Sequence, residues 1–166
     1  MHSALGKCTE HIHAFGGHSM AIGLTVYKDK IKDLYLSFEE QAEICEIENI
    51  QRVVEIDSEQ KLSNVTIQSV EELEKLEPYG EANRMPNFMF RNLKIDAIRQ
   101  LSEGKHIKLI LRDNIDTLEV IGFNQGDIIN DMHLGDIVDV VGNIEINEFN
   151  NSKKVQLLLR DIRKSF

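Results

Sequence analysis

The sequence contains no tryptophan, two prolines and two cysteines, and aromatic residues make up only 6% of its 166 residues. Cys8 and Cys45 lie far apart without a third or fourth cysteine, which excludes a cysteine-rich zinc site and favours free thiols in a reducing compartment. No apolar run approaches the roughly 18 residues that a membrane-spanning helix needs. The first residues also lack the apolar segment and cleavage site of a signal peptide. These absences predict a cytoplasmic protein that does not contact a membrane.

Motifs of common catalytic sites are missing as well. There is no G-x-x-x-x-G-K-[ST] phosphate loop, no G-x-S-x-G nucleophile turn and no H-E-x-x-H zinc pair. Three histidines, His11, His13 and His18, lie close together in the sequence. On a helix, however, His11 and His13 would point about 200° apart and could not share one ion. We therefore predict no catalytic residue and no metal ligand in this chain.

The formal net charge is −9, which argues against a nucleic-acid-binding protein, because such proteins are usually basic. The charges are unevenly distributed along the chain. Residues 39–81 hold 13 acids and 3 bases, whereas residues 84–112 hold 7 bases and 2 acids and residues 151–166 hold 5 bases and 1 acid. Two basic blocks in an acidic chain are either solvated surface or a local contact for a polyanion.

The spacing of apolar residues predicts helices and buried strands in the first half of the chain. Leu5, Cys8, Ile12 and Phe15 recur at three- and four-residue steps and predict a helix over residues 4–15. The remaining segments are predicted as a strand at 21–28, a helix at 29–44, a strand at 52–60 and a helix at 66–78 that Pro78 ends.

After a connector rich in turn-forming residues at 76–87, the pattern changes to strands and turns. Five strands are predicted, at residues 88–100, 106–113, 117–124, 136–149 and 153–164, with a short helical insertion between the third and the fourth. Alternation places Ile107, Leu109 and Leu111 on the core face of the second strand and Lys108 and Arg112 on its opposite face, and it places Val138, Val140, Ile144 and Ile146 on one face of the fourth. This order predicts a small OB-type β-barrel, and another five-stranded barrel or sandwich is the alternative. The fold class is therefore α+β.

The stretch Gly16-Gly17-His18 has two interpretations. Backbone N–H groups of the two glycines can approach an anion closely, and His18 can donate a hydrogen bond to a phosphate oxygen. Alternatively, Gly16 ends the predicted helix as its C-terminal glycine, and the histidine is an ordinary hydrogen-bonded residue. The spacing alone favours the second interpretation.

Two segments together resemble a known family. The sequence FGGHSMAIGLTV (15–26) is similar to the GGH motif of the DHH-associated domain, the second lobe of DHH-superfamily phosphoesterases. The sequence LEPYGEANRMPNFMF (76–90) resembles the L-x-P-F-G-x-G-N-x-x-P-x-F connector that leads into the OB domain of RecJ-type exonucleases, which degrade single-stranded DNA from the 5′ end. Ile22, Tyr79 and Ala82 depart from these motifs, and none of the departures falls on Gly16, Gly17 or His18.

The resemblance implies three parts: residues 1–75 as the C-terminal part of an α/β DHH-associated domain, 76–87 as the connector and 88–166 as the OB-type barrel. It also implies that Gly16, Gly17 and His18 hold a substrate phosphate. The family builds its metal site on an N-terminal lobe with a D-H-H triplet, which this sequence lacks. We therefore expect a C-terminal fragment with no cofactor of its own, inactive alone. The full-length enzyme would use Mn²⁺ or Mg²⁺ in DNA repair and recombination.

Single-stranded DNA is the expected partner, and a single-strand-binding protein is a candidate second one. We expect the strand to cross the first two strands of the barrel, on five basic residues: Arg91, Arg99, Lys105, Lys108 and Arg112. Two other functions stay open. The scarcity of aromatic rings fits an OB-type protein-interaction module, and the GGH motif also fits part of a DHH phosphoesterase that acts on short oligonucleotides.

Overall fold

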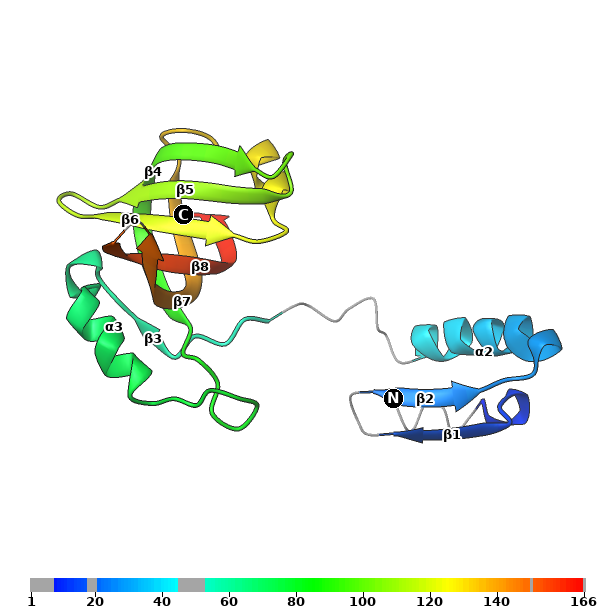
Figure 1. Ribbon diagram of the computed structural model, residues 1–166. Coiled ribbons are helices and arrows are strands. Elements are labelled where there is room, and N and C mark those ends of the chain that lie inside the picture. The colour runs from blue at the N-terminus through cyan, green and yellow to red at the C-terminus, as the bar shows by residue number, and fades with distance from the viewer. Residues whose placement is uncertain (1–7, 18–20, 45–52, 150, 166) are drawn as a thin grey trace. The chain divides into compact units, whose positions relative to one another are not determined.

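The computed structural model describes residues 8–17, 21–44, 53–149 and 151–165 (Figure 1). The chain forms two compact units, residues 1–53 and 54–166. The division predicted from the family resemblance, into residues 1–75, 76–87 and 88–166, describes family domains and not compact units, so it stays a prediction. Residues 54–75 nevertheless belong to the second compact unit.

In its described residues the first unit contains a short antiparallel hairpin and an α-helix. Its elements in chain order are η1 (Thr9–His11), β1 (Ala14–Gly17), β2 (Ile22–Thr25), η2 (Lys28–Lys30) and α2 (Ile31–Ile44). In the hairpin Phe15 lies opposite Leu24, and Gly16 lies opposite Gly23. The predictions of a strand at residues 21–28 and of a helix at residues 29–44 are confirmed by β2 and α2. The α-helix, however, begins only at Ile31, after the 3-10 turn η2.

The predicted helix over residues 4–15 is wrong in its described part. Residues 9–11 form a 3-10 turn and residues 14–17 form β1, while residues 4–7 lie outside the described residues. The i, i+3, i+4 stripe is overridden because the following strand offers a partner, and because two adjacent glycines favour a helix poorly. Gly16 therefore lies inside a strand, and the interpretation of it as a helix C-terminal glycine is wrong.

The second unit contains a closed ring of five strands: β4 (Phe88–Leu101), β5 (His106–Arg112), β6 (Thr117–Gly122), β7 (Ile137–Phe149) and β8 (Ser152–Lys164). The order around the ring is β4-β5-β6-β8-β7, and β7 pairs back to β4 (Figure 1). All these neighbours are antiparallel except β6 and β8, which are parallel. The helical insertion η5 (Gly126–Asn130) lies between the third and fourth strands of the ring, as predicted.

The long strand β4 closes the ring because it serves two neighbours. Its first half, residues 88–94, pairs with β7, and its second half, residues 94–101, pairs with β5. Register shifts occur in both ladders: one between Phe90 and Leu93, against β7, and one between Ile95 and Ala97, against β5. Asn92, within the first shift, has a φ of 56°. Such bulges bend a strand and increase its twist, which allows one strand to lie at both edges of the sheet.

Period-2 alternation places the core inside the ring. Ile107, Leu109 and Leu111 of β5 and Val138 and Val140 of β7 are completely buried, as the alternation predicted. Met132 after η5 joins the same apolar cluster from one end. Burial of a side chain of this size stabilises a fold by about 1.5–3 kcal/mol, so these residues hold the ring together.

Two further elements lie against the ring. β3 (Ser58–Glu59) pairs in parallel with the start of β4. A strand was predicted at residues 52–60, and within the described residues 53–60 only Ser58 and Glu59 form one. After the 3-10 turn η4 (Leu62–Asn64), α3 (Ile67–Glu74) begins at a capping box between Thr66 and Ser69 and contacts β7 and β8. It ends four residues before Pro78, earlier than predicted.

The connector at 76–87 is fixed by side-chain hydrogen bonds to backbone carbonyls. Tyr79 Oη donates to Leu73 O at the end of α3 (2.6 Å), and Asn83 Nδ2 donates to Leu76 O (2.8 Å). Asn143, which is buried in β7, donates to Pro86 O (2.8 Å). Leu73 O also accepts the backbone N–H of Leu76 (2.9 Å), so the Tyr79 bond is a second one to that carbonyl, while the amide side chains provide donors to Leu76 O and Pro86 O. The residues that resemble the family connector therefore fasten α3 to the ring.

Gly126 is expected to tolerate no side chain, because η5 lies directly against the turn between β4 and β5. A Cβ atom at Gly126 would lie 1.7 Å from the carbonyl oxygen of Gly104. Replacing Gly126 by alanine should therefore lower the free energy of unfolding by about 1–3 kcal/mol, as overpacking does elsewhere. Urea unfolding followed by circular dichroism measures this. Gly80→Ala is the matched control, since a Cβ there meets nothing within 4 Å. Equal stability of the Gly126 variant and the parent would contradict the close approach.

Candidate nucleic-acid interface

The outer face of β4, β5 and β6 carries most of the predicted basic residues. Lys108 and Arg112 alternate with the buried residues of β5 and so lie on the outside of the ring, as expected. In the ladder to β4, Arg99 lies opposite Lys108 and Lys94 lies opposite Arg112. We call this surface the outer face. Its strand residues are Lys94, Ala97, Arg99, His106, Lys108, Ile110, Arg112, Thr117, Glu119 and Ile121.

Ion pairs reduce the free positive charge on the outer face. Lys108 Nζ pairs with Glu119 of β6, and Arg112 Nη2 donates to Asp96 Oδ1 at 3.0 Å. Arg99 and Lys105, by contrast, are exposed and make no ion pair with another described residue. The sequence reveals the charges but not their partners, because both acids come from neighbouring strands. Lys94, opposite Arg112, is likewise exposed and makes no ion pair with another described residue, so the outer face keeps unpaired cations at both ends: Arg99 and Lys105 at one and Lys94 at the other.

Arg91 does not lie on the outer face. Its Nε donates to Glu59 Oε2 at 2.8 Å, and its Nη1 lies 3.4 Å from Asp139 Oδ2. The carboxylate of Glu59 raises the pKa of Arg91 above its ordinary value. Because Glu59 belongs to β3 and Asp139 to β7, Arg91 links β3 to the ring and is separated from the other four predicted residues.

Asp139 is a buried carboxylate at the junction of three strands. It accepts hydrogen bonds from Ser165 Oγ (2.7 Å), the backbone N–H of Asn92 (3.1 Å) and Arg163 Nη2 (3.2 Å). Burial alone would raise the pKa of Asp139, but these donors outweigh it and hold the pKa below its ordinary value of 3.8. The cluster fixes the bulge of β4 and the end of β8 to β7.

A hollow of about 440 Å³ lies where the β7–β8 hairpin meets the outer face. We call it the hairpin hollow. Lys108 and Glu119 of the outer face line it together with four hairpin residues: Asn147, Phe149, Ser152 and Lys154. Lys154 is exposed and makes no ion pair with another described residue. The hairpin therefore adds a cation and an aromatic ring to the outer face.

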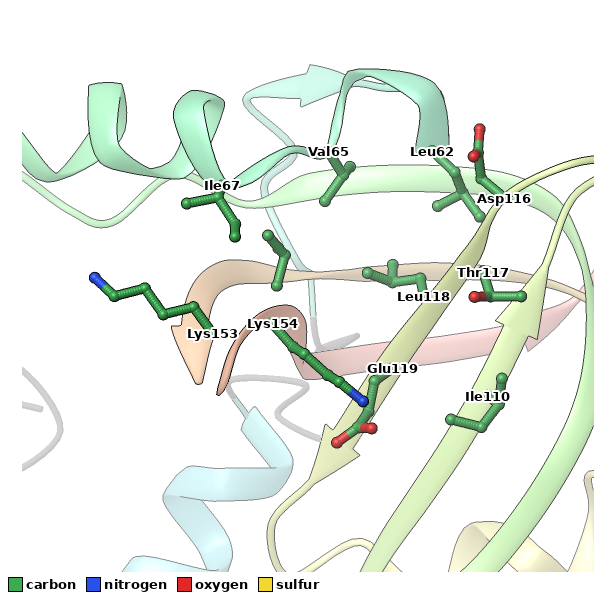
Figure 2. A pocket seen from close by; sticks show the side chains of 11 residues that line it. Leu62, Val65, Ile67, Ile110, Asp116, Thr117, Leu118, Glu119, Lys153 and Lys154 are labelled. Atoms are coloured by element: carbon green, nitrogen blue, oxygen red, sulfur yellow. The ribbon is translucent and has the colours of Figure 1, made fainter. Parts of the chain in front are cut away.

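A second hollow, of about 470 Å³, adjoins the first and shares Glu119 and Lys154 with it. Figure 2 shows Lys154 extending toward Glu119, with Leu62, Val65 and Ile67, the first residue of α3, forming the opposite wall. Thr117 and Lys153 also line it. The hairpin hollow and this second hollow thus adjoin at Glu119 and Lys154.

Sequence reasoning did not assign Lys154, Phe149, Phe123 or His106 to this surface. Phe123 follows β6, and its ring packs edge-on against His106 of β5 at a centroid distance of 5.3 Å. The basic block at 151–166 is a signal for Lys154. No local signal brings Phe149 to Lys108, because the two residues are 41 positions apart and meet only through the fold.

The described part of the Gly16-Gly17-His18 stretch is the end of β1, while His18 lies outside the described residues. Gly17 has a φ of +150°, which side-chain-bearing residues rarely adopt, and a Cβ there would lie 2.3 Å from the carbonyl oxygen of Ala21. Gly16 has open space around its missing Cβ. The hairpin therefore requires glycine at position 17 but not at position 16.

Within the described ranges, no three or more His, Cys, Asp or Glu side chains are placed to hold a metal ion. The described His, Cys, Asp and Glu residues therefore do not fit a catalytic Mn²⁺ or Mg²⁺ centre, and no catalytic step is assigned to them. In the same part of the chain no helix is long and apolar enough to cross a membrane.

Comparison with known proteins identifies the family. The model of the RecJ OB domain matches residues 56–161. The chain is 31% identical over 160 residues to the single-stranded-DNA-specific exonuclease RecJ of Bacillus subtilis (strain 168), which covers 95% of this chain and 20% of that protein. It is 27% identical over 153 residues to the RecJ of Dickeya dadantii (strain 3937), with 89% and 26% covered.

The crystal structure of RecJ from Thermus thermophilus in complex with Mn²⁺ matches with a TM-score of 0.75 and 25% identity, over 99% of this chain and 24% of that chain. The five-stranded ring with its helical insertion is an OB-like fold within an α+β chain, as predicted. The chain belongs to the RecJ OB domain family. It spans about a fifth to a quarter of the length of these relatives.

Proposed function

We propose that this chain is the substrate-gripping C-terminal region of a RecJ-type exonuclease that degrades single-stranded DNA in the 5′ to 3′ direction, in DNA repair and recombination. The observation that carries the proposal is the outer face of the ring, which presents exposed cations and two hollows in a member of this family. Cations along a groove bind the phosphates of a single strand without regard to its sequence.

The structure supports a refined set of contacts. Arg99, Lys105 and Lys108 lie at one end of the outer face, and Lys154 adjoins them across the hairpin hollow. Arg112 contributes less to DNA binding, because its ion pair with Asp96 compensates part of its charge. Arg91 stabilises the fold through its ion pair with Glu59 and does not contact DNA. The acids elsewhere in the chain repel stray polyanions and confine the contact to this surface.

The GGH stretch is proposed as a second contact, with a phosphate of the substrate. The position of a Cβ at Gly16 is open space, which leaves room for an anion to approach the backbone, and His18 supplies a donor. In the longer enzyme, Mn²⁺ or Mg²⁺ on other residues would supply the hydrolytic chemistry, while this chain binds and orients the strand. We place that enzyme in the cytoplasm, with a single-strand-binding protein as a candidate partner.

Replacing Lys108 and Arg112 together by glutamate should reduce the affinity of the chain for a labelled single-stranded oligonucleotide at least tenfold. The change removes two cations and leaves four carboxylates on the outer face, because Glu119 and Asp96 lose their partners. Fluorescence anisotropy at several salt concentrations measures the affinity. For the parent we expect log affinity to fall against log salt with a slope of about −2 to −3, as for a protein that neutralises about four phosphates of a single strand.

Asp127→Asn with Asp131→Asn is the matched control, since both acids are exposed in and after η5, outside the outer face. A Lys108→Gln, Arg112→Gln variant guards against misfolding from like-charge repulsion, and circular dichroism confirms the fold. If the glutamate and the glutamine variants of Lys108 and Arg112 both bind DNA as tightly as the parent, the outer face is not the DNA contact. A parent that binds no DNA at low salt would instead favour a protein-interaction module.

A further inference from the structure

Two aromatic rings at the outer face are far more exposed than burial of apolar surface would favour. Phe149 at the end of β7 is 71% exposed and Phe123 after β6 is 57% exposed, whereas Phe88 and Phe90 of the same unit are buried in the core. Neither exposed ring contributes to the apolar core cluster. Exposed aromatic rings beside a groove of cations are the platforms on which single-stranded nucleic acids stack their bases.

The Phe123 ring is held in place by its neighbours. It packs edge-on against His106, with an angle of 76° between the ring planes. The His106 ring is itself fixed, because its Nδ1 accepts a hydrogen bond from the backbone N–H of Asn124 at 2.9 Å. The contact orients Phe123 and leaves more than half of it exposed, which reduces the entropy lost when a base stacks on it.

Phe149 lines the hairpin hollow, where polar groups surround it. Asn147 and Ser152 can donate and accept hydrogen bonds at the edge of a base, and Lys108 and Lys154 can contact the adjoining phosphates. Glu119 pairs with Lys108 and holds that side chain at the hollow. A volume of about 440 Å³ is in the range of small-molecule sites and is sufficient for one nucleotide.

Both rings adjoin one row of cations. His106 and Lys108 are two residues apart on β5, so their side chains emerge on the same face. Phe123 contacts His106, Phe149 lines the hollow with Lys108, and Arg99 lies opposite Lys108 across the ladder. A strand that places a phosphate near Arg99 and Lys108 therefore has two aromatic rings nearby.

We infer that Phe123 and Phe149 are two base-stacking platforms of this chain, next to the Arg99–Lys108 row. The inference rests on the proposed binding of single-stranded DNA to the outer face and names how its bases are held. It adds base stacking to the phosphate contacts proposed above. Stacking does not release counterions, so the rings should contribute affinity that salt does not remove.

Phe123→Ala and Phe149→Ala should each reduce affinity for an oligonucleotide of thymidines about tenfold, because stacking is worth about 1–3 kcal/mol per base. The slope of log affinity against log salt should stay that of the parent, unlike the slope of the Lys108/Arg112 variants. An abasic oligonucleotide of the same length should bind the parent and the alanine variants equally. Both rings are exposed, so the midpoint of thermal unfolding should not change.

Phe149→Trp and Phe123→Trp give a second readout, because the chain has no other tryptophan. Each variant should keep the affinity of the parent, and its fluorescence should be quenched when the oligonucleotide binds. Ile115→Trp is the matched control: Ile115 is 86% exposed in the β5–β6 turn, outside the outer face, and should show no quenching.

The outcomes separate the two claims. A parent that does not bind DNA at low salt overturns the proposed function. A parent that binds with the expected salt slope, while the alanine variants bind equally well and neither tryptophan variant is quenched, overturns the stacking platforms alone.

Discussion

Replacing Asp139 by alanine is expected to lower the free energy of unfolding of the second unit by about 3 kcal/mol. Removing one partner of a buried ion pair costs about 3–5 kcal/mol elsewhere. The lower end applies here because Arg91 and Arg163 are about half exposed and water can solvate them. The loss also leaves Ser165 Oγ and the N–H of Asn92 without their acceptor. The midpoint of thermal unfolding should fall by about 10 °C.

The same variant should respond differently to acid. The pKa of Asp139 is below 3.8 in the folded chain, so its stabilisation is fully present above 3.8 and is lost as pH falls through the lowered value. Asp113 and Asp136 also have lowered pKa values, but they are common to parent and variant. The difference in unfolding free energy between parent and variant should therefore be constant from pH 7 to about 5 and shrink below about 4.

Urea unfolding across this pH range measures the difference. Asp161→Ala is the matched control, because Asp161 is exposed in β8 and lines the same hollow as Asp139. We expect its effect to be within about 0.5 kcal/mol of zero. A difference between parent and the Asp139 variant that does not change with pH would show that the carboxylate charge is not what stabilises the junction.

Replacing Gly17 by valine is expected to reduce the turnover of a full-length exonuclease that carries this chain by more than a hundredfold. The φ of +150° and the contact of 2.3 Å with Ala21 O leave no place for a β-branched side chain, so β1 and β2 could not keep their geometry. His18→Ala should lower turnover by about a hundredfold with little change in stability, as loss of an oriented donor does in other enzymes.

Gly16→Ala is the control for the glycine stretch, because its Cβ meets nothing within 4 Å and the substitution keeps the backbone N–H. We expect it to keep the stability of the parent, in contrast to Gly17→Val. Steady-state rates on a labelled single strand and thermal unfolding separate the two effects. If His18→Ala leaves rate and affinity unchanged, the stretch does not bind a phosphate and Gly17 serves the hairpin alone.

Local patterns predicted the elements of the second unit well. The alternation in β5 and β7 identified their buried residues, and the order of strands around the insertion predicted the OB-like topology. The first unit was harder. The apolar stripe through Cys8, Ile12 and Phe15 fits a helix, and only the pairing of β1 with β2 reverses that prediction. Pairing is a contact between segments, which a periodicity within one segment does not contain.

The basic residues show the same limit. Lys108 and Arg112 were correctly placed outside the core, because alternation is a property of one strand. Which carboxylates pair with them depends on which strands become neighbours. The same holds for Arg91, which lies at the junction around Asp139 and not on the outer face.

The sequence by itself determined the five strands of the ring, their inward and outward residues, the basic block around residue 108 and the two motifs that resemble the family. Only the tertiary structure decided that β4 bends to close the ring, that ion pairs cancel part of the basic block, and that Phe149 meets Lys108. The physical reason is range: hydrophobic periodicity is encoded between residues two to four positions apart. Ion pairs and hollows form between residues that are brought together only when the ring closes.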